Sequence, residues 1–216
     1  MVRFADNYSM SGETMILVNG GLRSLIATAT ALSDPTNNAP VLVHFRDGRF
    51  AEERRAERVR MQADHFGLQR LVQFQLPALS TSNAPAKVTD ELQRVPMFRS
   101  RTLANGLALA CEAEIERLIW PVQFDADFDQ IGATTEQIQL LRHSAQLENT
   151  NAPTVETPLI ELTDQQLVEL GGQLSVPWNL AWSCLLEEPK PCNTCAGCRR
   201  RMDGFAAAGM EDRKAA

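Results

Sequence analysis

The sequence predicts an α/β fold, in which a parallel sheet carries helices on both faces, with a small zinc-binding subdomain at the C-terminus. Two observations lead to this prediction. Short β-branched runs alternate with helical segments through most of the chain, and successive strand–helix–strand units form parallel sheets with right-handed crossovers. Four of the five cysteines then gather near the C-terminus. We therefore expect an α/β domain over residues 1–172, with a nucleotide-type ligand site, and a zinc-binding subdomain over residues 173–216.

A glycine-rich turn follows the first predicted strand, which covers residues 15–18. A helix rich in alanine is expected after the turn, from Leu25 to Leu32. In this layout the N–H groups at the helix N-terminus can receive an anion, and a double glycine lets the backbone approach a phosphate. The candidate phosphate-binding residues are Asn19, Gly20, Gly21, Leu22, Arg23 and Ser24. Ser24 would add a hydroxyl donor, and the alternative is a tight turn that serves packing alone.

Two more strands and an intervening helix continue the sheet. The strands are predicted over residues 41–45 and 71–76, and a charged amphipathic helix over residues 50–66. Ligands of open parallel sheets bind at the carboxyl ends of the strands. The glycine turn falls at this edge, so we place the candidate ligand site there.

The second half is predicted to contain three helices and two extended segments. The helices are expected over residues 102–116, 134–147 and 164–172, and the extended segments over residues 118–122 and 154–160. Pro121 indicates a strand end or a sheet edge. Thr134 with Gln137, and Thr163 with Gln166, have the spacing of helix-capping pairs. These two pairs place the N-termini of the last two helices.

Two loops separate these elements. Residues 77–89 are rich in Ser, Ala, Pro and Asn and predict a mobile loop, a candidate lid. Residues 123–132 are acidic and are expected to form a loop after the fourth strand. Cys111 stands alone in an apolar helical run, and we predict that it is a small buried hydrophobe.

The cysteines Cys184, Cys192, Cys195 and Cys198 have the spacing of a structural zinc site. The last three are arranged as C-x-x-C-x-x-C, and the first lies one loop upstream. Four thiolates suit a tetrahedral ion with sulfur bonds of about 2.3 Å and leave no open position for catalysis. Two disulfides would require an oxidising compartment, and an iron–sulfur cluster would also accept four thiolates. The run Arg199–Arg201 is expected to offset the negative charge of zinc bound by four thiolates.

Composition and charge argue against several classes of protein. The formal net charge of −6 and the isoelectric point near 5.2 argue against a general binder of nucleic acids or anionic membranes. Met1–Thr14 lacks the basic and apolar regions of a signal peptide. No apolar run approaches the roughly 18 residues of a membrane span. We therefore expect a cytoplasmic protein whose reduced thiols are free for metal.

Several motifs resemble those of the 7-cyano-7-deazaguanine synthases, members of the PP-loop ATP pyrophosphatase superfamily. The resemblance is carried by A-W-S-C at 181–184, P-C-N-T-C-A-G-C at 191–198 and A-G-M-E-D at 208–212. The order of the upstream segments also agrees, with the phosphate turn followed by V-P-x-x-R at 95–99 and T-P-L-I-E-L-T at 157–163. The resemblance therefore extends over nearly the whole chain.

This resemblance implies a Rossmann-like fold of the adenine nucleotide alpha hydrolase type and an ATP-dependent ligase of queuosine-precursor biosynthesis. The implied reaction adenylates a carboxylate, 7-carboxy-7-deazaguanine or a related acid. Ammonia then gives the amide, and a second ATP-driven step gives the nitrile. The implied cofactors are ATP with Mg²⁺ and a structural Zn²⁺ on the four cysteines. A homodimer is implied as well, and no membrane or nucleic-acid partner is expected.

The phosphate turn departs from the family motif at two positions. The family has S-G-G-x-D-S, whereas this chain has N-G-G-L-R-S, with Asn19 in place of the first serine and Arg23 in place of the aspartate. An aspartate beside a triphosphate can help to hold Mg²⁺, whereas an arginine binds no cation and adds a positive charge. The turn could therefore bind nucleotide with altered metal use, bind a different anion, or be filled by a salt bridge of Arg23.

The substrate side departs too. Residues 124–129 differ from the family's loop after the fourth strand, and Arg99 and Ser100 stand where the family has an arginine–asparagine pair. We therefore assign no substrate-contacting or catalytic residue. The alternatives to the family reaction are a catalytically inactive or repurposed paralogue, acting as a nucleotide-binding or assembly protein, and a ligase for a different acid.

Overall fold

The sheet of the molecule is entirely parallel. The computed structural model describes residues 13–34, 38–48, 51–77, 97–149 and 151–212. Its five strands have the order β3-β2-β1-β4-β5. They are β1 (Thr14–Leu17), β2 (Val41–Arg46), β3 (Leu71–Gln75), β4 (Arg117–Ile119) and β5 (Thr154–Glu156). The predicted parallel α/β fold is confirmed.

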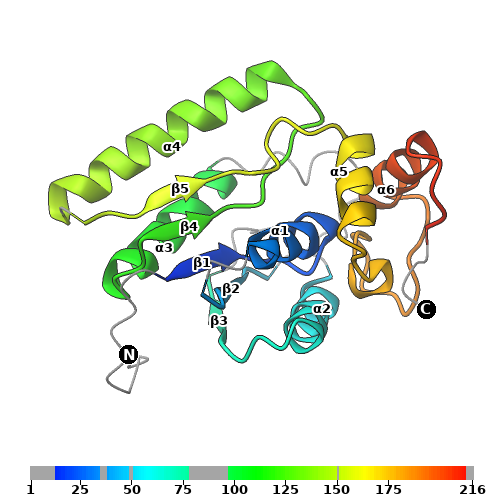
Figure 1. Ribbon diagram of the computed structural model, residues 1–216, viewed down its shortest axis with the longest axis horizontal. Helices are drawn as coiled ribbons and strands as arrows, with labels where there is room; N and C mark the ends of the chain where they lie inside the picture. The colour runs from blue at the N-terminus through cyan, green and yellow to red at the C-terminus, as the bar shows by residue number, and fades with distance from the viewer. Residues whose placement is uncertain (1–12, 35–37, 49–50, 78–96, 150, 213–216) are drawn as a thin grey trace.

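Helices cover both faces of this sheet and extend past its carboxyl edge (Figure 1). They are α1 (Leu22–Ser33), α2 (Glu52–His65), α3 (Phe98–Glu112), α4 (Phe128–Glu148), α5 (Asp164–Gln173) and α6 (Ala196–Ala207), with a short 3-10 turn at Trp178–Leu180. Helices α1 and α2 pack on one face, and α3 and α4 on the other. Helices α5 and α6 pack against each other beyond the carboxyl ends of the strands (Figure 1).

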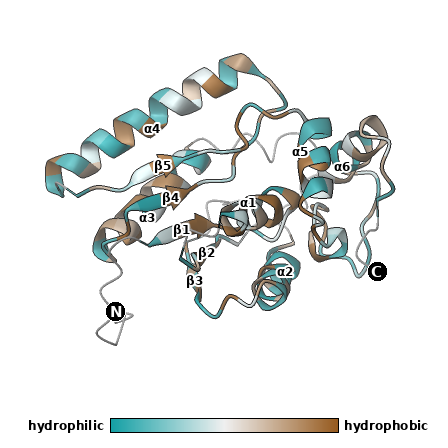
Figure 2. Ribbon diagram, viewed as in Figure 1, coloured by the Kyte–Doolittle hydropathy of each residue, from teal (hydrophilic) through white to brown (hydrophobic). Residues whose placement is uncertain are grey.

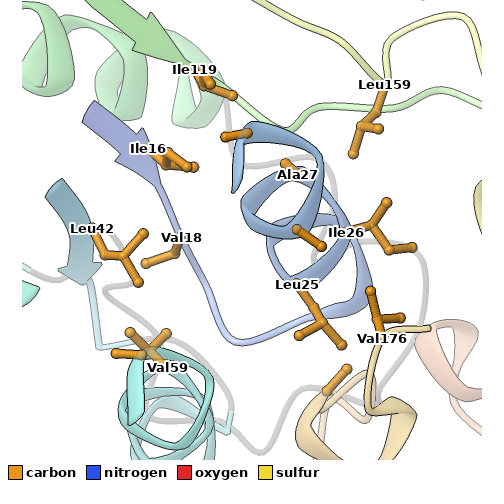
Figure 3. Close-up of a cluster of buried hydrophobic side chains, with 14 of the residues drawn as sticks. Ile16, Val18, Leu25, Ile26, Ala27, Leu42, Val59, Ile119, Leu159 and Val176 are labelled. Carbon is orange, nitrogen blue, oxygen red and sulfur yellow. The ribbon is translucent and has the colours of Figure 1, made fainter. Parts of the chain in front are cut away.

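The first core cluster lies between the sheet, α1 and α2 (Figure 3). Ile16 of β1 and Val59 of α2 are fully buried, as are Leu25 and Ile26 of α1. The alanine-rich surface of α1 brings its backbone close to the sheet. On the far side of α1, Val176 closes the cluster after α5, so the C-terminal part shares this core (Figure 3).

The second core cluster lies under α3 and α4. Met15 and Leu17 point from β1 to this face, opposite to Ile16, so β1 is buried on both faces, as is typical of parallel sheets. Gly106 of α3 packs directly on Leu17, and a Cβ at this glycine would lie 2.9 Å from a Leu17 methyl carbon. In Figure 2, hydrophilic and hydrophobic residues alternate along α4.

The sequence misplaced the starts of α3 and α4. Helix α3 begins at Phe98 rather than at residue 102, and it ends earlier because Glu114 adopts a left-handed φ of +54°. The N–H of Ile115 then bonds back to the carbonyl of Ala110 at 2.8 Å, which closes the helix. The expected capping pair at residues 134 and 137 is also wrong. Helix α4 begins at Phe128, inside the segment expected to be an acidic loop.

Other local predictions are confirmed or corrected. Thr163 and Gln166 form a reciprocal capping box on α5. Strand β4 lies inside the sheet between β1 and β5, so Pro121 marks a strand end and not an edge. Cys111 is half-buried rather than buried.

The expected lid lies almost wholly outside the described residues. The division of the chain at residue 172 stays a prediction. No helix in the described part of the chain has the length and apolar content to cross a membrane.

Candidate functional site

The glycine turn joins β1 to the first turn of α1. Gly20 adopts a left-handed φ of +72°, and Gly21 is the N-cap residue of α1. The side-chain oxygen of Asn19 accepts hydrogen bonds from the N–H of Gly21 at 3.0 Å and from the hydroxyl of Ser24 at 3.1 Å. Ser24 is fully buried, so its hydroxyl serves within the turn. A phosphate role for these turn residues stays a prediction.

The first turn of α1 has the properties of an anion site. The N–H groups of Leu22, Arg23 and Ser24 begin the helix and have no acceptor within it. No acidic residue lies in this first turn, and no side chain caps the helix. The positive end of the helix dipole is therefore open to an anion at the carboxyl edge of the sheet.

We predict that Gly20→Ala destabilises the protein by about 1–3 kcal/mol, because an alanine must adopt a left-handed φ there. A Cβ would also lie 2.5 Å from the backbone carbonyl oxygen of Arg55, which cannot move away as a side chain can. The matched control is Gly132→Ala in the exposed helix α4, where a Cβ meets nothing within 4 Å. This control should be neutral or stabilising. The measurement is the urea unfolding midpoint, and equal midpoints for the two variants would contradict the prediction.

Gln123 connects the glycine turn to the C-terminal helices. It lies directly after β4 and is almost fully buried, with 1% of its surface exposed. Its backbone carbonyl accepts a hydrogen bond from Nη1 of Arg23 at 3.3 Å. Its side-chain oxygen accepts from Nη2 of Arg200 at 2.7 Å, and its side-chain nitrogen donates to Asp164 at 3.1 Å and to the carbonyl of Leu162 at 2.7 Å. Gln123 therefore bonds to the glycine turn through its backbone carbonyl and to α5 and α6 through its side-chain amide.

Arginines gather around this junction. The pKa of Arg23 is lowered to about 10, first by burial and then by the charges of Arg200, Arg55 and Arg99. Arg99 also lies over the ring of Phe124, with 4.5 Å from the guanidinium carbon to the ring centre. Arg99, from the segment that the family resemblance had singled out, thus acts electrostatically on Arg23 of the glycine turn. A salt bridge of Arg23, one of the three alternatives for this turn, does not occur among the described residues, where Arg23 bonds to a backbone carbonyl.

The four cysteines form one compact cluster. Their sulfur atoms all lie within 4.8 Å of one another. The sulfurs of Cys184 and Cys195 are 3.9 Å apart, and those of Cys192 and Cys198 are 4.0 Å apart. These separations are too long for disulfide bonds of about 2.05 Å. They agree with four sulfurs at 2.3 Å from a tetrahedral ion, which lie about 3.8 Å apart. The cluster therefore fits a single metal ion.

Backbone N–H groups point at the sulfurs. Cys195 is the N-cap residue of α6, and its sulfur accepts from the N–H of Cys198 at 3.4 Å. The N–H groups of Leu186 and Cys192 both lie 3.4 Å from the sulfur of Cys184. Burial raises the pKa of the Cys184 and Cys198 thiols. A bound cation would therefore be needed to hold these two as thiolates at neutral pH.

The arginine that interacts electrostatically with the cysteines is Arg55, which the sequence analysis did not indicate. Arg200 bonds to Asp164 at 2.6 Å, and Arg201 bonds to Asp212 at 2.7 Å. These two arginines are thus occupied by carboxylates. The charges of Cys184 and Cys195 act instead on Arg55, in the first turn of α2. The predicted charge compensation is therefore wrong for Arg200 and Arg201, and for Arg199 it stays a prediction.

Trp182 joins the cysteine cluster to the glycine turn. Its backbone N–H donates to the carbonyl of Gly20 at 2.8 Å. Its ring is 1% exposed and packs in one apolar cluster with Ala51, Cys184, Cys195 and Cys198. A backbone hydrogen bond therefore links the glycine turn to the segment that carries the cysteine cluster.

The acidic segment after β4 has mainly structural roles. Asp127 is the N-cap of α4, and its side chain accepts from the N–H of Gln130 at 3.1 Å. Asp125 accepts from the N–H of Asp164 at 2.8 Å, at the start of α5. Both carboxylates thus satisfy helix N-termini. Sequence reasoning missed these roles, together with those of Arg55 and Gln123. The position of Gln123 just after a parallel strand was the one available signal.

Comparisons with known proteins agree on one family. A family model described as "Queuosine biosynthesis protein QueC" matches residues 13–209. The 7-cyano-7-deazaguanine synthase of Chlorobaculum parvum is 27% identical over 228 residues, which cover 93% of this chain and 94% of the relative. The enzyme of the same name from Nautilia profundicola is 26% identical over 217 residues, which cover 93% of this chain and 96% of the relative.

A solved structure with the same fold comes from a different enzyme. The U34-tRNA thiolase NcsA of Methanococcus maripaludis matches with a TM-score of 0.51 at 11% identity. The match covers 89% of this chain and 65% of the thiolase chain. At this identity the likeness supports the fold alone.

Proposed function

The chain belongs to the QueC family of queuosine biosynthesis proteins, and from this premise we propose that it is an ATP-dependent ligase of the 7-cyano-7-deazaguanine synthase type. Its substrate would be 7-carboxy-7-deazaguanine or a closely related carboxylate, which ammonia converts to the amide and then to the nitrile. The proposal places this enzyme in the cytoplasm, as a homodimer. It includes no membrane or nucleic-acid partner.

The observation that carries this proposal is the joined pair of sites at the carboxyl edge of the sheet. The glycine turn offers helix N–H groups that have no acceptor within the helix, and the N–H of Trp182, next to the cysteine cluster, bonds to the carbonyl of Gly20 at 2.8 Å. Both parts correspond to motifs by which the chain resembles the family. An anion site of this kind suits the first chemical step, because a carboxylate becomes reactive toward ammonia only after activation.

In that step a carboxylate oxygen attacks the α-phosphorus of ATP, and the bond to pyrophosphate breaks. Ammonia then adds to the acyl carbon, loses a proton, and expels AMP to leave the amide. The N–H groups of the first turn of α1 would hold the leaving pyrophosphate, since they face developing negative charge. The buried Gln123 network would keep Arg23 and Arg200 in place beside it.

We further propose that the ion of the cysteine cluster is Zn²⁺ with a structural role. The sulfur separations of 3.9 and 4.0 Å support a single tetrahedral ion. An iron–sulfur cluster would have to fit several iron and sulfide atoms between the ligand sulfurs, which would spread them farther apart. Four protein thiolates leave no coordination position for substrate.

The direct test is exchange of labelled pyrophosphate into ATP, with 7-carboxy-7-deazaguanine and ammonia, and mass spectrometric detection of the nitrile. We expect acid-dependent exchange in the wild type. Gly20→Ala should reduce the rate on the order of 100-fold, because a displaced turn misaligns the phosphates, while Gly132→Ala should retain the wild-type rate. Silence of a folded, metal-loaded wild type, with and without Mg²⁺, would favour a non-catalytic paralogue. Exchange with another acid alone would identify a ligase for that acid.

A further inference from the structure

The charge around the glycine turn is strongly positive. Three arginines, Arg200, Arg55 and Arg99, act on Arg23 and lower its pKa. Asp164 is the one carboxylate found to act on Arg23 within the described part of the chain, and Nε of Arg200 already bonds to it at 2.6 Å. Arg23 therefore shares its one carboxylate with Arg200, and the positive end of α1 adds to the positive charge near the turn.

These guanidinium groups have donors to spare. Arg23 has five N–H donors, and its recorded hydrogen bond among the described residues uses one of them, to Gln123 at 3.3 Å. The Nε atom of Arg55 is buried and has no hydrogen-bond partner there. The backbone of Arg55 touches the turn, since a Cβ at Gly20 would lie 2.5 Å from its carbonyl oxygen. A buried, unpartnered charged donor is costly, and an anion bound at the turn could satisfy it.

A divalent cation does not fit this edge of the turn. Mg²⁺ requires oxygen ligands and is usually held by one or two carboxylates together with substrate phosphates. At position 23 the chain instead carries a guanidinium group, which offers no ligand atom and repels a cation. Asp164 is bonded to Arg200. Asp47 acts on Arg55 and His44, and Asp127 acts on Arg99, and neither of these two other carboxylates acts on Arg23.

We propose that the glycine turn binds the polyphosphate of its ligand as the metal-free anion, with Arg23, Arg55, Arg99 and Arg200 supplying the positive charge that a divalent cation would otherwise supply. The identity of this ligand, ATP and its pyrophosphate product, rests on the proposed function. The inference that this ligand binds without a divalent cation rests on the arginines alone. Guanidinium groups suit this role because they form paired, fixed hydrogen bonds to phosphate oxygens.

The test is titration calorimetry of the metal-loaded protein with inorganic pyrophosphate and, separately, with ATP. Buffers are freed of Mg²⁺ on a resin rather than by a chelator, so that the cysteine-bound ion stays in place. Ionic strength is held constant. We expect both anions to bind without Mg²⁺, and saturating Mg²⁺ to raise the Kd at least about tenfold, because the Mg²⁺ complex carries less negative charge and meets fixed positive charge.

Two variants and a matched control make the inference specific. Arg23→Gln should weaken Mg²⁺-free binding, and Arg23→Asp should make binding tighter with Mg²⁺ than without it. Arg60→Asp changes the charge equally, on the exposed side of α2, and should keep the wild-type Mg²⁺ response. Circular dichroism checks the fold of each variant, and Arg23→Gln serves if Arg23→Asp does not fold.

The outcomes separate the two proposals. Wild-type binding that requires or is strengthened by Mg²⁺ would overturn the metal-free inference and leave the proposed ligase function standing. Failure of both ATP and pyrophosphate to bind a folded protein under either condition would overturn both. A Mg²⁺ response that is the same in the wild type and in Arg23→Asp would also contradict the inference, because Arg23 would then have no part in it.

Discussion

Removal of the ion from the cysteine cluster is expected to unfold the C-terminal part of the chain and to lower the thermal midpoint by on the order of 10–20 °C. Structural zinc contributes about 10–16 kcal/mol of apparent binding free energy in small zinc domains. A change of 1 kcal/mol shifts the midpoint of a chain of this size by about 2–4 °C. Even half of the zinc contribution therefore gives a shift of this order.

The reason lies in what the cluster holds together. Three of the five buried residues of the third apolar cluster belong to the cysteine cluster itself, and the other two are Ala51 and Trp182. Without the ion, this cluster keeps few apolar contacts of its own, and burial leaves Cys184 and Cys198 as neutral thiols. The bond from Trp182 to Gly20 would be lost with it, so pyrophosphate binding should fall at the same time.

The measurement is a calorimetric melt before and after chelation, together with metal analysis. Cys198→Ser should reproduce the effect, and Cys111→Ser is the matched control because Cys111 lies outside the cluster. Re-addition of Zn²⁺ should restore the midpoint in the wild type but not in Cys198→Ser. An unchanged midpoint in a protein shown to be metal-free would contradict the prediction.

Local sequence patterns predicted the elements whose structure is set by near neighbours. The strands β1, β2 and β3 follow β-branched runs, and the capping box of Thr163 and Gln166 involves residues three apart. The cysteine cluster also belongs here, because three of its ligands lie in one short turn and helix N-terminus. In each case the determining interactions lie within a few residues of chain.

The sequence analysis missed features that depend on contacts between residues far apart in the chain. Both Asp127 and Thr134 are good N-cap residues, and the choice of Asp127 depends on how α4 packs on the sheet. Gln123 gains its importance from Arg23 and Arg200, which lie 100 and 77 residues away in the chain. No periodicity records such contacts. The arginines of the predicted amphipathic helix likewise gave no indication that Arg55 would be the one on which the cysteines act electrostatically.

Arg201→Ala is expected to destabilise the metal-loaded protein by about 3–5 kcal/mol, as the loss of one partner from a buried ion pair typically does. Arg201 is 7% exposed, and its guanidinium group bonds to both oxygens of Asp212. It also donates to the carbonyls of Ala181 at 2.8 Å and Trp178 at 2.9 Å. The alanine would leave a carboxylate and two carbonyls without this donor.

Arg201 therefore links Asp212 to the segment that carries Trp182. Its loss should also make the glycine turn less ordered. The matched control is Arg199→Ala, two residues away on the same helix and exposed, which should change the stability by no more than about 0.5 kcal/mol. Urea unfolding at constant Zn²⁺ measures both. Asp212→Asn in the Arg201→Ala background should recover part of the loss, because it removes the stranded charge. Equal stabilities of the two arginine variants would show that the pair with Asp212 contributes nothing to the fold.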